Sequence, residues 1–115
     1  MEIVKSYPNN LDKLEIYRMT RSHDIIKMST IKDSVLDVAA YIYYHDIRTK
    51  SNGSEEEYRI LTVKTEQGEI YATNSKTFID EFLYISDLFP DDLKGIKVVG
   101  AISKNARNFI TCEKV

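Results

Sequence analysis

Apolar and polar residues recur at regular intervals along the chain, and their period predicts the elements that it forms. Residues 35–48 are rich in β-branched and aromatic side chains, which is typical of a long strand. Residues 58–65 and 69–73 have the same character and are separated by Gln67-Gly68, a tight-turn signal. Asn52-Gly53 marks a turn before them, because both residues tolerate a positive φ angle. The pattern therefore predicts a meander of three strands.

A helix and a hairpin are predicted after the meander. Ser75 is a suitable N-cap, because its hydroxyl can accept a free backbone N–H of the first turn. Pro90 ends the helix by disfavouring helical geometry at the residue before it. Residues 96–103 and 108–113 then form the last two strands. The apolar stripe that defines the helix consists of Phe78, Ile79, Phe82, Leu83, Ile85 and Phe89.

The first third of the chain has weaker signals. Residues 1–13 include Pro8-Asn9-Asn10 and are predicted to be a flexible lead-in. Residues 14–19 alternate between apolar and polar side chains, which predicts an additional strand. Residues 25–28 are predicted to continue it, followed by a turn over residues 29–33. Residues 14–115 are therefore expected to form one domain.

The order of the predicted elements is strand, strand, strand, helix, strand, strand. A parallel sheet needs strands that alternate with helices, and only one helix is predicted. An antiparallel sheet that closes into a small barrel fits better, because closure removes exposed strand edges. The sequence thus predicts a mainly β protein, namely a five-stranded OB-fold barrel with one helix between strands 3 and 4, plus an N-terminal extra strand.

Alternation along the long strand over residues 35–48 assigns its side chains to two faces. One face is expected to point into the core, and the other, which includes Tyr41, Tyr43 and His45, is expected to point outward. Alternation near the end of the chain sets Phe109 opposite Ile110 and Cys112. If those two face inward, Phe109 is a surface residue; otherwise it packs in the core, which we favour. The expected core face of the long strand consists of Leu36, Val38, Ala40, Ile42 and Tyr44.

The charge of the chain is small in total but unevenly distributed. The net charge is −2, which argues against a strongly basic nucleic-acid binder. Residues 13–32 nevertheless carry a local charge of +3 and residues 94–115 one of +4, whereas residues 54–92 carry −7. The fold can thus expose a basic face and an acidic back, unless these runs are simply solvated surface.

Few residues have the spacing that catalysis or metal binding requires. The sequence has no Gly-rich phosphate loop and no Cys/His metal pattern, so we expect no enzyme activity, cofactor or metal. Cys112 is the single cysteine, which excludes an internal disulfide and suggests a reducing cytoplasm. No segment approaches the length of a membrane span, so no membrane association is expected.

Three segments of the chain resemble a known family. Residues 16–22, 71–79 and 103–112 are similar to segments of small single-stranded DNA-binding proteins from phages and mobile elements of Gram-positive bacteria. The likeness covers residues 14–113. It implies an OB fold, the bacterial host cytoplasm and sequence-tolerant binding of single-stranded DNA during replication or recombination. The resemblance leaves open a homodimer or cooperative assembly on DNA, and contacts with replication proteins.

Binding of a single strand needs flat side chains on which bases stack and cations that follow the phosphates. The aromatic and cationic side chains of the meander, the leading strand and the last hairpin provide both kinds. The alternative is that tyrosines in strands pack structurally, and we expect this of about half of the eight. The predicted binding residues are Tyr17, Arg18, Arg21, Tyr41, Tyr43, Arg48, Lys50, Tyr58, Arg59, Tyr71, Lys104 and Arg107.

A second function on the same fold is a protein-interaction module. In that case the acidic side or the tyrosine face would bind a protein of a replication or host-takeover complex. The fold alone does not separate the two functions, because OB barrels carry many. The resemblance favours binding of single-stranded DNA.

Overall fold

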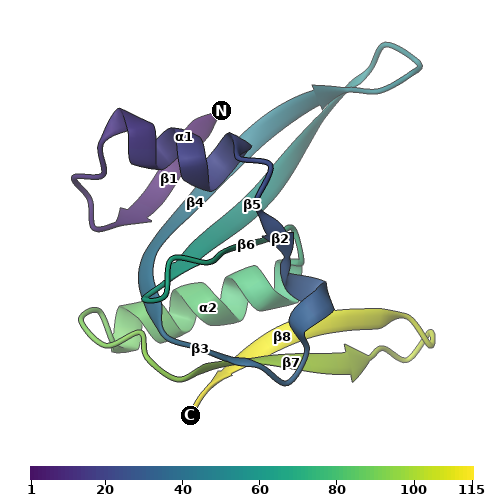
Figure 1. Ribbon diagram of the computed structural model, residues 1–115. Helices are drawn as coiled ribbons and strands as arrows, with labels where there is room; N and C mark the ends of the chain where they lie inside the picture. Colours follow the sequence, from purple (N-terminus) through teal and green to yellow (C-terminus); the bar gives the residue numbers. More distant parts are fainter.

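A computed structural model describes all 115 residues and divides the strands between two sheets. The larger sheet contains β1 (Glu2–Tyr7), β4 (Val38–Thr49), β5 (Glu55–Thr65), β6 (Ile70–Thr73) and β2 (Ile26–Lys27), in the order β1-β4-β5-β6-β2. The smaller sheet contains β3 (Val35–Leu36), β7 (Ile96–Ile102) and β8 (Asn108–Lys114), in the order β3-β7-β8. The chain passes from one sheet to the other between β3 and β4, at Asp37 (Figure 1).

The mainly β class and the predicted element order are confirmed from β4 onward. Helix α2 (Lys76–Leu88) lies between β6 and β7, where the apolar stripe predicted it. Ser75 is its N-cap, with a side-chain oxygen that accepts from the Phe78 N–H. The predicted closed barrel is wrong, because the strands form two sheets and no ladder of hydrogen bonds joins their outer edges. The long bent strands β4 and β5 instead project beyond the body as a hairpin (Figure 1).

The first 21 residues differ from the prediction. The expected flexible lead-in contains β1, which pairs with β4. The expected strand over residues 14–19 is a helix, α1 (Lys13–Arg21). The side chain of Asp12 accepts from the Glu15 N–H at 2.8 Å and caps this helix. Leu11 before the cap and Ile16 in the first turn both pack against the same apolar cluster, which fixes the entry into the helix.

A bulge in β4 changes the face of the larger sheet to which its side chains point. The pairing of β4 with β5 shifts between Val38 and Ala40, so the alternation of side chains slips by one residue there. Val38 therefore shares the main core with Tyr41 and Tyr43, whereas Ala40 faces the other way. The predicted single core face of this strand is wrong beyond the bulge.

Two apolar clusters hold the sheets together. The main core lies between the larger sheet, α2 and the smaller sheet, and its fully buried side chains include Phe78, Phe82 and Ile96. The second cluster lies under α1 and contains Met19, Ile42, Tyr44 and Ile60. Two short segments connect these parts, namely β2 and a 3-10 helix, η1 (Met28–Ile31). One side of the sheet thus rests on α2, and α1 covers only part of the other.

Candidate nucleic-acid interface

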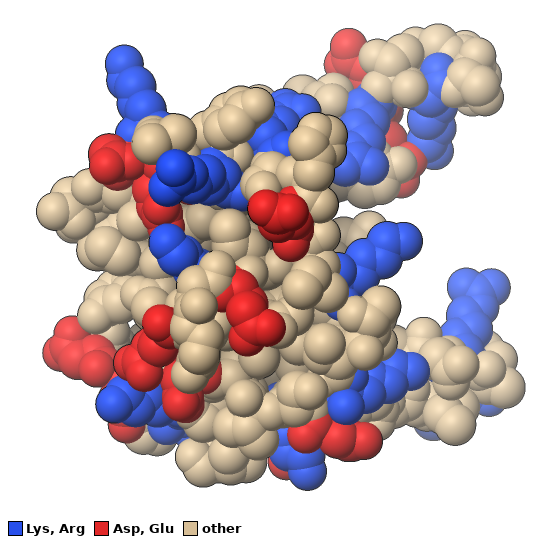
Figure 2. Space-filling view, in the orientation of Figure 1, with Lys and Arg blue, Asp and Glu red and all other residues tan.

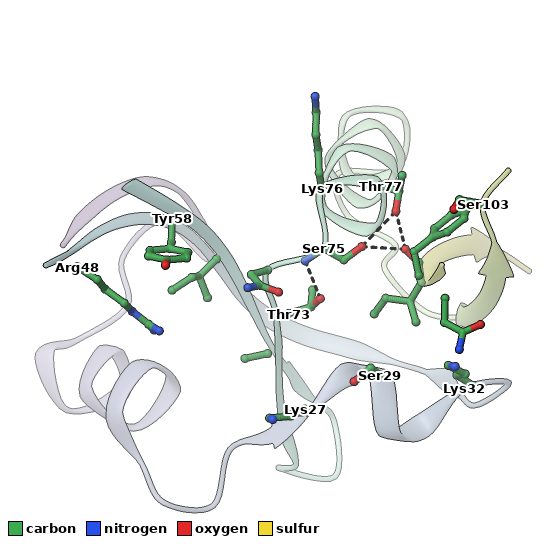
Figure 3. A pocket seen from close by; sticks show the side chains of 16 residues that line it. Lys27, Ser29, Lys32, Arg48, Tyr58, Thr73, Ser75, Lys76, Thr77 and Ser103 are labelled. Carbon is green, nitrogen blue, oxygen red and sulfur yellow. Dashed lines mark hydrogen bonds between the residues drawn. The ribbon is translucent and has the colours of Figure 1, made fainter. Parts of the chain in front are cut away.

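A groove of about 1100 Å³ opens between two projecting hairpins. One wall is the β4–β5 hairpin and the other is the β7–β8 hairpin, while the N-terminal end of α2 and the β2–η1 segment lie between them. Arg48 and Tyr58 line one side and Ser103 the other, with Ser75 and Thr77 between them (Figure 3). The lining residues are Lys27, Ser29, Lys32, Arg48, Tyr58, Ile60, Ala72, Thr73, Asn74, Ser75, Lys76, Thr77, Ser103, Asn108, Phe109 and Ile110.

The charge of the groove is entirely positive. Lys27, Lys32, Arg48 and Lys76 line it, and no carboxylate does. None of these four cations has an ion-pair partner within 4.0 Å. Lys and Arg side chains border the hollow between the hairpins in Figure 2, although acidic side chains also occur on the upper of the two hairpins. The groove therefore has a local potential that attracts anions, despite the net charge of −2.

Two half-buried aromatic side chains face this groove from its opposite walls. Tyr58 lies on β5 and Phe109 on β8, and both line the groove. Because Ile110 and Cys112 are buried in the main core, alternation turns Phe109 away from it, so the favoured core packing of Phe109 is wrong. The guanidinium of Arg48 lies over the Tyr58 ring, 5.0 Å from its centroid. The groove thus combines flat apolar surface with unpaired cations.

Hydrogen bonds fix the base of the groove. The hydroxyls of Ser75 and Thr77 both donate to the carbonyl oxygen of Ile110, at 2.9 and 2.7 Å. The Ser75 N–H donates to the Thr73 hydroxyl at 3.0 Å. These bonds connect the start of α2 to β8, so the two walls are joined through the N-terminal turn of the helix (Figure 3).

Three of the predicted stacking tyrosines are not available to a ligand. Tyr41, Tyr43 and Tyr71 are 3, 7 and 6% exposed and belong to the main core. Tyr41 packs edge-on against Phe82, with ring centroids 5.1 Å apart. Burial also raises the pKa of the Tyr71 hydroxyl. The prediction that these rings form an outward surface for bases is wrong, because α2 and the smaller sheet cover that face.

Two of the predicted phosphate ligands are already paired with carboxylates. Arg59 donates to Asp80 at 2.6 Å and through Nε to the Tyr43 hydroxyl at 2.7 Å. The Asp80 carboxylate raises the pKa of Arg59, with a smaller effect from Tyr43. Lys50 lies 3.1 Å from Glu56. A phosphate would have to displace these partners, so neither cation resembles the free ones of the groove.

The other predicted cations are free but lie outside the groove lining. Lys104 and Arg107 are exposed in the turn of the β7–β8 hairpin and make no ion pair within 4.0 Å. They extend the positive charge beyond the end of the wall that carries Phe109. Tyr17, Arg18 and Arg21 are exposed on α1 rather than on a strand, and none of them lines the groove.

Of the twelve predicted binding residues, the structure brings only Arg48 and Tyr58 into the groove. The sequence analysis missed Lys27, Lys32 and Lys76 as site residues. Lys27 and Lys32 belong to the basic stretch over residues 13–32, which was the available signal. Lys76 follows the N-cap of α2, and a position at a helix start gives no indication of the strand that will face it.

The comparisons with known proteins add no relative. Neither a protein-family model, nor a curated protein, nor a solved structure matches the chain. No helix of the structure is both long enough and apolar enough to cross a bilayer.

Proposed function

We propose that the protein binds single-stranded DNA in the groove between its two hairpins, without strong preference for sequence. The observation that carries the proposal is the lining itself, where four unpaired cations and two accessible aromatic rings occur without any carboxylate. Proteins that bind single strands combine these two elements, because cations follow the backbone and aromatic rings stack bases of any identity.

Each wall has a defined role in this proposal. Tyr58 and Phe109 provide the surfaces on which two bases stack, at opposite sides of the groove. The four groove cations, Lys27, Lys32, Arg48 and Lys76, contact phosphates, and Lys104 and Arg107 extend that path along the second hairpin. A duplex keeps its bases stacked inside, so it can use the cations but not the rings.

The proposed kinship and setting have two further points of support. The element order from β4 to β8 is that of an OB fold, so we propose that the domain is an opened relative of that fold. The resemblance to single-strand binders of phages and mobile elements is the reason to propose replication or recombination in a bacterial cytoplasm as the setting. Assembly along DNA and contacts with replication proteins are part of this proposal.

Fluorescence anisotropy tests the proposal directly. A labelled oligo-thymidine and a duplex of equal length are titrated with the protein at low and moderate salt. We expect the single strand to bind more tightly than the duplex, and both to weaken as salt rises. Absence of binding to the single strand at low salt would contradict the function. Equal affinity for both forms would remove the stacking component, and tighter binding of an RNA strand of the same sequence would change the substrate to RNA.

A protein-interaction function is the second candidate, and one surface favours it. Tyr84 and Leu88 are 60 and 58% exposed on the outer face of α2. Glu81 lies on the same helix and Asp91 just after it, and neither has an ion-pair partner within 4.0 Å. An exposed aromatic and apolar pair beside free carboxylates suits a basic protein partner better than it suits DNA. Retained DNA binding in a Tyr84→Ala, Leu88→Ala variant would separate this surface from the groove.

A further inference from the structure

Four residues of the β4–β5 hairpin form a charged cluster at the edge of the groove. This hairpin cluster consists of Arg48 on β4, Lys50 in the turn, and Glu56 and Tyr58 on β5. Glu56 accepts a hydrogen bond from the Tyr58 hydroxyl at 2.9 Å and lies 3.1 Å from the Lys50 ammonium. Arg48 lies over the Tyr58 ring and has no ion-pair partner within 4.0 Å.

The position of Arg48 in this cluster is unexpected from the pairing of the strands. Arg48 and Glu56 are directly opposed partners in the β4–β5 ladder. Opposed side chains in an antiparallel pair have Cβ atoms about 5 Å apart, which is within easy reach of a guanidinium–carboxylate pair. Such a pair is nevertheless absent, because the Glu56 carboxylate already has Lys50 and the Tyr58 hydroxyl as partners.

At neutral pH the ionised Glu56 carboxylate is a partner for which Lys50 and Arg48 compete. Lys50, with a smaller contribution from the Tyr58 hydroxyl, lowers the pKa of the Glu56 carboxyl. The carboxylate is therefore ionised at neutral pH and attracts a cation within reach. If Lys50 is removed, Arg48 is the cation across the strand pair, and a bidentate pair with Glu56 would occupy the donors that Arg48 presents to the groove.

We infer that Lys50 is a positioning residue, which occupies Glu56 and thereby keeps Arg48 free on Tyr58 to contact phosphate. This inference rests on the proposed binding of single-stranded DNA and refines it. Lys50 itself is not a phosphate ligand in this scheme, although the sequence predicted that it is one. Lys50 affects DNA affinity only by occupying Glu56, so removing Lys50 should matter only while the Glu56 carboxylate is present.

A double-mutant cycle distinguishes this role from direct contact. Lys50→Ala is expected to weaken oligo-thymidine binding about fivefold. Glu56→Gln alone is expected to change it less than about twofold, because the carboxylate is already compensated. In the Lys50→Ala background, Glu56→Gln should restore the affinity to about that of Glu56→Gln alone, since no carboxylate remains to capture Arg48. An equal effect of Glu56→Gln in both backgrounds would contradict the inference.

Lys104 provides a matched control for the loss of one positive charge. It is exposed on the other hairpin and has no carboxylate partner within 4.0 Å. The effects of Lys104→Ala and Glu56→Gln should therefore be additive. Coupling between Lys104 and Glu56 as large as that between Lys50 and Glu56 would indicate a general charge effect and would overturn the positioning role.

A measurement without DNA separates the inference from the function on which it rests. The Arg48 Nε–H resonance, assigned in ¹H–¹⁵N spectra of the free protein, should move in Lys50→Ala and return in the double variant. An unmoved resonance would overturn the capture of Arg48 even if the protein binds DNA. Absence of oligo-thymidine binding by the wild-type protein would overturn the proposed function and the phosphate role of Arg48, whatever the resonance does.

Discussion

Tyr58 and Phe109 are the two aromatic side chains that a ligand in the groove can reach. Each is half-buried, so its ring is held by the wall of its hairpin while one part stays accessible. Stacking a base on such a ring contributes about 1–3 kcal/mol and does not depend on which base it is. These two residues are therefore the most direct test of stacking at the residue scale.

We predict that Tyr58→Ala and Phe109→Ala each weaken oligo-thymidine binding by between about fivefold and 150-fold. The loss arises because a base that leaves the ring regains no equivalent apolar contact. Tyr84→Ala is the matched control, because Tyr84 is 60% exposed on α2 and does not line the groove. Anisotropy titrations measure the affinities, and unchanged affinity in both groove variants would exclude stacking at this site.

Tyr43 should behave in the opposite way, although the sequence grouped it with Tyr58. Its ring is 7% exposed in the main core, and its hydroxyl accepts from Arg59 Nε at 2.7 Å. We predict that Tyr43→Ala lowers the free energy of unfolding by about 3–5 kcal/mol, because it leaves a cavity and an unpaired Arg59 donor. Urea unfolding measures this loss. If Tyr43→Ala instead had normal stability and reduced DNA affinity, Tyr43 would be a binding residue and not a core residue.

Cys112 gives a prediction about pH. Burial raises the pKa of its thiol from 9.0 to about 12. Between these two values the unfolded chain releases the thiol proton and the native chain retains it, so stability falls as pH rises. At pH 10 the loss due to this group is about 1.4 kcal/mol.

Urea unfolding at pH 8 and pH 10, with Cys112→Ala as the control, measures this contribution. The decrease in stability between the two pH values should be smaller in Cys112→Ala by about the stated amount. The native thiol should also react slowly with a thiol reagent at pH 8, because the thiolate is scarce and buried. Rapid reaction in the native state would show that the side chain is accessible and its pKa ordinary.

The tyrosines show why the site could be predicted only in part. Alternation correctly separates Tyr43 from Tyr44 on β4, but it does not reveal that both faces of the strand are covered. That burial depends on α1 being a helix and on the bulge beside Ala39, which are properties of other segments. Arg48 and Tyr58 are the predicted residues that line the groove, and each keeps accessible surface there.

At the scale of elements, α2 both caps the main core and connects the walls of the groove. Ser75 contributes to each role, since its hydroxyl accepts from the Phe78 N–H and donates to the Ile110 carbonyl. Thr77 contributes only the second contact. The two side chains therefore allow the cap to be separated from the connection to β8.

We predict that Ser75→Ala lowers the free energy of unfolding by about 1–2 kcal/mol, because it removes a cap and a hydrogen bond to β8. Thr77→Val should cost less, about 0.5–1 kcal/mol, because it removes the hydrogen bond to the Ile110 carbonyl and the contact with the Ser75 hydroxyl but leaves the cap in place. Urea unfolding compares the two variants. An equal loss in both would mean that the cap at Ser75 contributes nothing measurable.

Elements with strong local signals were the predictable ones. The Ser75 cap, the stripe to Phe89 and Pro90 define α2 without reference to the rest of the chain. Helix α1 is only nine residues long, and its first apolar positions alternate as a strand would. The spacing of Asp12 and Glu15 is a signal of a helix start that the alternation does not reveal.

At the scale of the whole molecule, the pattern of apolar and polar residues does not determine whether the barrel closes. Closure requires the outer strands of one sheet to meet, which depends on twist and on the shear between strands. Here the chain leaves the smaller sheet at Asp37, and the bulge beside Ala39 follows at once. The hairpins consequently diverge instead of pairing, and the groove lies in the space between them (Figure 1).

The distribution of charge over the whole molecule sets the response of binding to salt. The net charge of −2 would repel DNA, whereas the groove carries four free cations and the adjacent hairpin turn two more. Each phosphate contact with a single strand contributes about −0.7 to the slope of log K against log salt. Four contacts therefore predict a slope of about −2.8, or about a fiftyfold loss of affinity between 50 and 200 mM salt.

Single charge removals test whether the groove or the overall charge controls this slope. Lys76→Ala should make the slope less steep by about 0.7, because it removes one phosphate contact. Lys94→Ala removes the same charge from an exposed loop that does not line the groove, so its slope should equal that of the wild type. Equal slopes in the two variants would mean that a groove cation contributes no more to the salt dependence than a cation elsewhere on the surface. The positive potential of the groove would then not explain how a protein of net negative charge binds DNA.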